Sequence, residues 1–395
     1  MRASAPPAAA RRARWVLDAL GAHDVALGEE LPFRPEAWEQ VERGERPEGD
    51  ELAEAFFHLA RVEERSAARD KHGRFPAGAS LLDPLDPPLE SLRRRLGIEP
   101  PRWGGARFAV ALTHDVDVPW RWTRSGIRAA AGGLRRGDWR EAQALAALPV
   151  HRLRGSDPNW CFDRIVRMEK RASVRSTFFL LVGHNHPADG PAPEVYERLR
   201  PRVIEAVAAG GMEIGLHGSY TAAEDETRLA EEKRRLEALA GPVRGQRYHY
   251  LRVDPPRNLA PLERLGFAYD STLGYADGLG FRAGIAHPFR PWNLQEDRPL
   301  DLFEIPLAVM DVTLAEKRYL DLPARAAWNR IATLLDWAAE HGGGFAILWH
   351  TDRFDPWTAR GWDRLYEQVL AGVRERGGIC LSAGELAEEA AAWAS

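Results

Sequence analysis

The sequence predicts an α/β protein in which a parallel (β/α) barrel follows a helical N-terminal region. From residue 106 onward, short apolar segments alternate with longer amphipathic ones, a pattern typical of parallel strands joined by helical crossovers. Eight apolar segments of strand length occur there, which favours a barrel over an open sheet. Several of them end in polar residues, and in barrels the catalytic side chains lie at the carboxyl ends of the strands.

The composition sets limits on the partners of the chain. Its 395 residues suffice for one large domain with an appendage. The chain has 54 Lys and Arg against 58 Asp and Glu, and the net charge of -4 indicates neither a nucleic-acid partner nor an anionic membrane surface. The arginine clusters at 93–95 and 135–136 are interpreted as solvated helix faces. We find neither the apolar core of a signal peptide nor the roughly 18 apolar residues of a membrane span, and therefore expect a cytoplasmic protein.

Residues 1–104 are predicted to form a separate helical region. Helical periodicity covers 14–20 and 51–65, and a short helix over 89–96 follows a turn-rich passage. Prolines at 100 and 101 and glycines at 104 and 105 then interrupt the chain. We place a domain boundary there, so that the barrel spans 105–395.

The barrel region divides into strands and helices by the length and periodicity of its apolar segments. Strands are predicted at 108–113, 174–182, 212–217, 246–252, 267–270, 302–307, 345–350 and 378–382. Helices are predicted at 162–170, 194–208, 226–239, 325–341 and 362–376.

The first predicted strand runs into two aspartates. Alternate side chains of a strand share a face, which places Thr113, Asp115 and Asp117 together and turns His114 the other way. One carboxylate can hold a cation while the other, close to that charge, stays ionised and takes a proton from a bound water. The alternative is an aspartate pair that caps a helix or makes surface hydrogen bonds.

Histidines follow three later apolar runs. His217 ends the third strand, His249 lies in an Arg-x-His-Tyr segment of the fourth, and His350 follows the last long apolar run. A single histidine in such a place is usually a hydrogen-bonded core residue. Three of them together with the aspartate pair are hard to attribute to packing, so we expect one shared site at the barrel rim.

The ordered motifs resemble those of the polysaccharide deacetylases over residues 106–384. The resemblance rests on the aspartate pair, on Ser-Thr-Phe-Phe at 176–179, on Glu-Ile-Gly-Leu-His at 213–217, on 266–272 and on Ile-Leu-Trp-His at 347–350. It implies a distorted (β/α)7-type barrel and a metal-dependent hydrolase, with a divalent ion such as zinc, that removes an acetyl group from a sugar.

Residue roles follow from the same resemblance. Asp115 resembles the general base, and Arg252 resembles the arginine that orients it. Asp117 and His217 resemble metal ligands, and His350 resembles the acid that protonates the leaving group, with Asp311 or Asp352 as its partner.

The third metal ligand departs from the family pattern, because Thr221 stands where a second histidine is usual. His249 is the preferred replacement, His287 is the reserve, and His184 and His186 follow. Two alternatives stay open: Thr221 or extra water completes a weaker site, or the protein binds no metal.

Three aromatic residues on segments near the rim, Trp349, Tyr275 and Trp292, are candidates for stacking on sugar faces, with simple packing as the alternative. The expected substrate is an acetylated sugar or glycan precursor. A non-sugar amide hydrolase on the same barrel and an inactive glycan-binding homologue are the competing interpretations.

Overall fold

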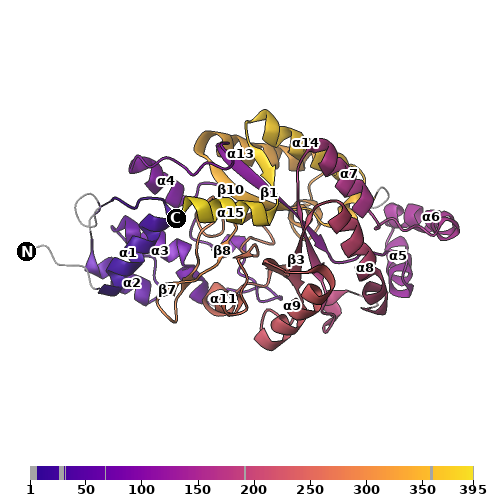
Figure 1. Ribbon diagram of the computed structural model, residues 1–395, viewed down its shortest axis with the longest axis horizontal. Helices are drawn as coiled ribbons and strands as arrows, with labels where there is room; N and C mark the ends of the chain where they lie inside the picture. Colours follow the sequence, from indigo (N-terminus) through magenta and orange to yellow (C-terminus); the bar gives the residue numbers. More distant parts are fainter. Residues whose placement is uncertain are drawn as a thin grey trace, which may run out of the picture.

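The computed structural model describes residues 7–25, 31, 33–66, 68–190, 193–355 and 359–394. Its centre is a curled sheet of parallel strands in the order β8-β5-β4-β3-β2-β1-β10-β9, with β11 pairing with β1 as well (Figure 1). The strands are β1 (Phe108–Val116), β2 (Thr177–Leu181), β3 (Glu213–Gly218), β4 (Gly245–Tyr248), β5 (Tyr269–Asp270), β8 (Phe303–Glu304), β9 (Leu307–Met310), β10 (Gly343–Leu348) and β11 (Ile379–Leu381). β6 (Trp292–Asn293) and β7 (Arg298–Pro299) form a separate antiparallel pair. The half-barrel confirms the predicted fold class.

Helices follow the strands as the alternating pattern predicted. They are α7 (Phe162–Ala172), α8 (Pro193–Ala209), α9 (Glu226–Ala240), α10 (Pro255–Asn258), α11 (Ala260–Arg264), α12 (Asp311–Ala315), α13 (Ala324–His341), α14 (Trp362–Glu375) and α15 (Ala383–Trp393). The central strand β1 is buried along its whole length, because elements pack on both faces of the sheet, which explains its unbroken apolar run.

Two strand predictions are wrong in detail. The predicted strand 302–307 is two strands, β8 and β9, separated at Pro306, which has no N–H to donate to a neighbouring strand. The predicted strand 246–252 ends at Tyr248, and a 3-10 turn, η4 (His249–Leu251), follows it. Tyr250 and Leu251 in this turn have φ of 62° and 54°, an unusual conformation for side chains of their size.

The N-terminal region is helical, as predicted, and lies at one end of the molecule (Figure 1). It consists of α1 (Pro7–Ala19), α2 (Pro35–Glu42), α3 (Glu51–Leu59), the 3-10 turns η1 (Val62–Arg65) and η2 (Ala77–Ala79), and α4 (Pro88–Arg95). Its apolar side chains belong to the same hydrophobic cluster as those of the barrel.

Buried polar contacts also join the two regions. Arg282 of the barrel donates to Glu64 at 2.6 Å, and His287 lies 3.0 Å from Glu90. All four side chains are buried, so the two regions share polar contacts as well as an apolar core.

At the opposite end of the molecule, two helices project between β1 and α7 as a hairpin (Figure 1). They are α5 (Arg124–Arg135) and α6 (Trp139–Arg154); neither range was predicted as a helix, although Arg135 and Arg136 were interpreted as a helix face. Within the described residues, no helix is both long enough and apolar enough to span a bilayer.

Candidate metal centre and active site

The predicted convergence of strand ends is confirmed. A cavity of about 270 Å³ lies at the carboxyl ends of the strands and is lined by Asp115, Asp117, His217, His249 and His350. These residues come from the ends of β1, β3, β4 and β10. The alternation in β1 is also as expected, since His114 lies on the opposite face and contacts Glu169 at 2.9 Å.

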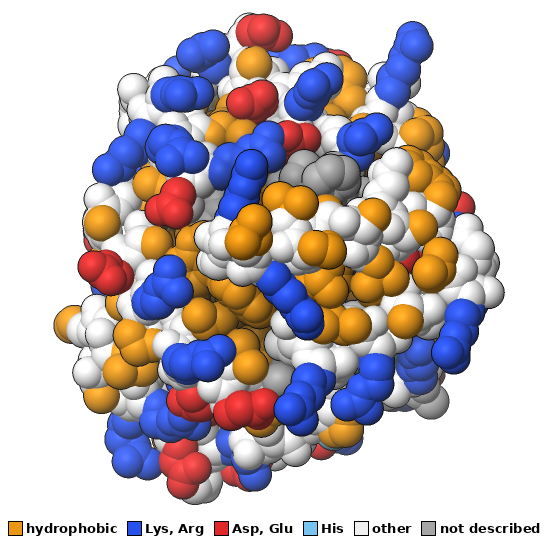
Figure 2. All heavy atoms as spheres, turned by 90° about the vertical axis from the view of Figure 1, so that its right-hand side faces the viewer, with side chains coloured by type: hydrophobic (Ala, Val, Ile, Leu, Met, Phe, Trp, Pro, Cys, Tyr) orange, Lys and Arg blue, Asp and Glu red, His pale blue; other side chains and the backbone are white. Residues whose placement is uncertain are grey.

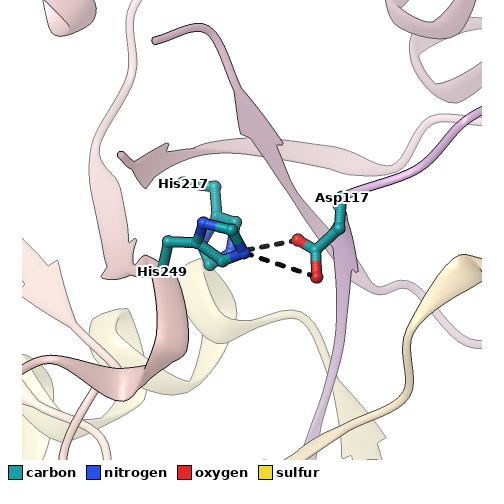
Figure 3. A group of neighbouring side chains, drawn as sticks. All are labelled: Asp117, His217 and His249. Carbon is teal, nitrogen blue, oxygen red and sulfur yellow. Dashed lines mark ion pairs between the residues drawn. The ribbon is translucent and has the colours of Figure 1, made fainter. Parts of the chain in front are cut away.

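Asp117, His217 and His249 form a cluster with the spacing of a metal site (Figure 3). One ligand atom from each lies within 4.8 Å of the other two. His217 Nε2 is 3.3 Å from Asp117 Oδ1, and His249 Nε2 is 3.7 Å from Asp117 Oδ2. The preferred third residue, His249, therefore stands with the other two.

Hydrogen bonds fix which nitrogen of each histidine faces the cluster. His217 Nδ1 donates to the backbone carbonyl of Arg247 at 2.9 Å, and His249 Nδ1 donates to Asp189 Oδ1 at 3.1 Å. Both Nε2 atoms are thereby turned toward Asp117. Metal-ligating histidines commonly hold their second nitrogen in this way.

The polar atoms at the centre of the cluster fit a cation. Within the described chain, His217 Nε2 and Asp117 Oδ1 are buried and have no hydrogen-bond partner. Burial lowers the pKa of His249, but Asp117 and Asp189 together outweigh it through their charges and hydrogen bonds and raise that pKa to about 9. A proton on Nε2 and a metal ion compete for the same lone pair, and two imidazoles with one carboxylate are a ligand set that suits zinc.

His249 is held in place by two residues far away in sequence. Asp189 is buried and also accepts from the backbone N–H groups of Tyr220 at 2.7 Å and His186 at 3.1 Å. Arg74 of the N-terminal region donates to the carbonyl of Tyr250 at 3.1 Å, in the turn that carries His249. Asp189 thus holds the His249 side chain, and Arg74 holds the backbone of the turn that carries it.

The reserve ligands lie elsewhere. His287 is buried between Glu90 and the carbonyl of Ala19, at 3.0 and 2.9 Å. His184 lies 2.8 Å from the carbonyl oxygen of Asp189, and His186 stacks on Tyr220 with ring centroids 4.2 Å apart. These histidines have structural contacts, and Thr221 is not among the residues lining the cavity.

Asp115 lies beside the cluster and pairs with an arginine. Its Oδ1 accepts from Arg247 Nη1 at 3.0 Å, while its Oδ2 lies 3.5 Å from His217 Nε2. The Arg247 guanidinium also donates to Thr113 at 2.8 Å and to the carbonyl of Ser271 at 2.7 Å. The two buried charges are therefore paired, as a carboxylate that stays ionised requires.

The prediction that Arg252 orients Asp115 is wrong. Arg252 donates to the carbonyls of His72 and Tyr220 and to Glu224, and its guanidinium lies 4.0 Å from the Tyr220 ring centroid. The strand ends at Tyr248, so Arg252 follows the turn and lies outside the cavity. Alternation along the predicted strand 246–252 gave a usable signal, because it would place residues 247 and 249 on one face and residue 252 on the other.

His350 faces the cluster from β10. Its Nδ1 donates to Asp311 Oδ1 at 2.6 Å, and its Nε2 lies 3.6 Å from Asp117 Oδ2. Burial lowers the pKa of His350, but Asp311, together with the smaller contributions of Asp117 and Asp115, outweighs this effect and raises it to about 10. Asp311 is therefore the partner, whereas burial raises the pKa of the other candidate, Asp352. The imidazolium is the expected form near neutral pH.

The three predicted stacking residues are buried in the core. Trp349 has no exposed surface and packs on Tyr366, because alternation turns it away from the face that carries His350. Tyr275 is 2% exposed. Trp292 is 4% exposed, and its ring centroid lies 5.1 Å from that of Trp15 in the N-terminal region. The packing alternative holds for all three.

The mouth of the cavity is formed by residues that sequence reasoning missed or left without a role. Arg74, Tyr250, Arg318, Tyr319 and Arg353 all line it. Arg74 donates to the Tyr319 hydroxyl at 2.9 Å, so the N-terminal region contributes directly to this rim.

Comparison with known proteins places the fold. No family model matches the sequence, and no curated protein is similar to it. A structure described as a polysaccharide deacetylase from Mycobacterium smegmatis has a TM-score of 0.51 at 21% identity, covering 74% of this chain and 94% of that one. Another so described, from Pseudomonas aeruginosa, has a TM-score of 0.49 at 18% identity, covering 73% and 94%. Puue allantoinase has a TM-score of 0.50 at 18% identity, covering 79% and 98%. The first and third likenesses show the fold that the motifs implied.

Proposed function

We propose that this chain is a metal-dependent hydrolase of the polysaccharide deacetylase type, which removes an N-acetyl group from a sugar or glycan precursor. One observation carries the proposal. A base paired with Arg247 and an acid paired with Asp311 stand around one Asp-His-His cluster in the same cavity.

Each side chain has a distinct task in this reaction. Asp117, His217 and His249 would hold a divalent ion such as zinc, which would polarise the acyl oxygen and acidify a water. Asp115 accepts the proton of that water at Oδ2, since its Oδ1 is engaged by Arg247.

The leaving group needs a proton as well. The oxygen of the water bonds to the acyl carbon, the carbon–nitrogen bond breaks, and the amine leaves with a proton from His350 Nε2. Asp311 keeps His350 oriented and protonated until that step. The products are acetate and the free amino sugar.

Acetate release from N-acetylated chitooligosaccharides and from O-acetylated sugars tests the proposal. We expect zinc-dependent release by the wild type and loss of release in Asp115→Asn and His350→Ala. Asp157→Asn is the matched control, because within the described residues this buried aspartate accepts from backbone N–H groups alone and does not line the cavity. Release by the control should equal that of the wild type.

Two outcomes would overturn the proposal. Hydrolysis of a cyclic amide such as allantoin without any acetate release would assign the site to a different amide. Sugar binding with full metal occupancy and no turnover of any substrate would favour an inactive glycan-binding protein.

A further inference from the structure

The α5–α6 hairpin has a charge opposite to that of the whole chain. Residues 124–154 contain seven arginines and two acidic residues, a net charge of +5 in a chain of net charge -4. The net charge of the whole chain indicates no anionic partner surface, but this one segment is strongly basic.

Six of the seven arginines of the hairpin are described as exposed. Within the part of the chain that the structure describes, six of them have no ion pair with a carboxylate: Arg124, Arg128, Arg135, Arg136, Arg152 and Arg154. Some exposed arginines elsewhere pair with acids, as Arg264 does with Glu226 at 2.7 Å, and others, such as Arg325 and Arg330, have no ion pair within the described residues. The positive charge of the hairpin is thus not neutralised by the protein itself.

Large apolar side chains are exposed among these arginines. Of the eight large hydrophobic residues exposed in the described chain, four lie in the hairpin: Leu134, Trp139, Val150 and Leu153. Leu153 is 90% exposed. Among the described side chains of the two helices, the buried residues are all small, namely Ala130, Gly133 and Ala144. Figure 2 shows this end of the molecule, where hydrophobic side chains lie among many Lys and Arg side chains.

Exposed arginines interleaved with exposed aliphatic and aromatic side chains suit one kind of partner. Anionic lipid headgroups attract the guanidinium groups, and the acyl boundary below them accepts the apolar side chains. A nucleic-acid backbone would use the charges but would leave Val150 and Leu153 in water. We propose that the α5–α6 hairpin docks the protein on the surface of an anionic lipid bilayer.

The place of the hairpin in the chain gives this docking a consequence. Arg124 follows Asp117 by seven residues, which span at most about 25 Å. The hairpin therefore leaves the sheet at the edge that holds the cavity, and docking keeps the cavity close to the bilayer. The proposal does not depend on which bond the enzyme hydrolyses.

Sedimentation with lipid vesicles tests the proposal on the full-length protein. We expect binding to vesicles that contain phosphatidylglycerol and none to vesicles of phosphatidylcholine alone. Arg135→Glu with Arg136→Glu should weaken binding at least about 25-fold, because each basic residue near an anionic surface contributes roughly fivefold. Arg325→Glu with Arg330→Glu on α13 is the matched control. Both α13 arginines are exposed and lack ion pairs within the described residues, so this variant should bind like the wild type.

A second variant separates the apolar contribution from the charge. Val150→Ser with Leu153→Ser leaves the net charge unchanged and should also weaken vesicle binding, with an unchanged thermal unfolding midpoint because both side chains are exposed. Wild-type protein that ignores anionic vesicles would overturn the proposal. An equal loss of vesicle binding in the α13 control would also overturn it. The same holds if the wild-type protein binds single-stranded RNA and does not bind the vesicles.

Discussion

Replacing Asp189 with asparagine tests how the third histidine of the cluster is held. Asp189 Oδ1 accepts from His249 Nδ1 and from the Tyr220 backbone, and Oδ2 accepts from the His186 backbone. Asparagine is nearly the same size but turns one acceptor into a donor. In either orientation of its amide, at least one of these N–H groups faces another donor, and the charge that favours the N–H on His249 Nδ1 is lost.

The expected effect is a loss of metal affinity. Replacing the carboxylate behind a metal-bound histidine lowers affinity about 10- to 100-fold, or about 1.4 to 2.8 kcal/mol. Zinc affinity is measured by competition with a chromophoric chelator. A lost buried hydrogen bond also lowers the free energy of unfolding by about 1 to 3 kcal/mol, so thermal unfolding is recorded in parallel.

Asp157→Asn is the matched control, since this buried aspartate accepts from the backbone N–H groups of residues 121, 122 and 159 and touches no histidine of the cluster. It should lose stability but keep its zinc affinity. Unchanged affinity in Asp189→Asn, or an equal fall in the control, would refute the idea that Asp189 positions His249.

Three further predictions concern the acid, the arginine and the interface. His350→Ala should lower kcat for acetate release by about 100-fold or more while zinc content stays at the wild-type level, as measured by steady-state kinetics and metal analysis. Arg247→Ala should lower the free energy of unfolding by about 3 to 5 kcal/mol because it leaves Asp115 buried and unpaired, whereas Arg252→Ala should leave that ion pair intact; chemical denaturation with activity assays compares them. Burial raises the pKa of Glu90, but its basic partners outweigh this and lower it to about 2. A depressed carboxylate pKa stabilises the fold above the ordinary value of 4.5, and the stabilisation is lost as pH falls toward 2. Glu90→Gln should therefore flatten the acid side of the stability curve recorded by thermal unfolding between pH 2 and pH 6.

The parts of the site that could be predicted depend on local pattern. Asp115, Asp117, His217 and His350 come directly at or after strand ends, and strand alternation with the barrel rule places them on one rim. His249 was the preferred third ligand for the same reason, although the strand prediction there ran too far.

The wrong or missing site residues are those whose positions depend on the tertiary structure and not on local sequence pattern. Arg252 was given the role of orienting Asp115 from the family resemblance, but Arg247 makes that contact, because the chain turns after Tyr248 and carries residue 252 away from the cavity. Asp189 and Arg74 reach the His249 turn from distant segments, so no spacing connects them to it.

The role of the aromatic residues could not be predicted from the sequence either. Trp349 and Trp292 are equally compatible with a sugar platform and with a core, and only the packing of the N-terminal region and of α14 decides between these. The hairpin was not predicted as two helices, although Arg135 and Arg136 were interpreted as a helix face.

The metal content of the purified protein tests the central claim most directly. After dialysis against zinc and then metal-free buffer, elemental analysis should find one zinc ion per wild-type chain and little in folded Asp117→Ala or His249→Ala. Asp157→Asn should retain the wild-type amount. A wild-type chain that holds no more zinc than Asp117→Ala would contradict the account, because the cluster of Asp117, His217 and His249 would then not be a metal centre.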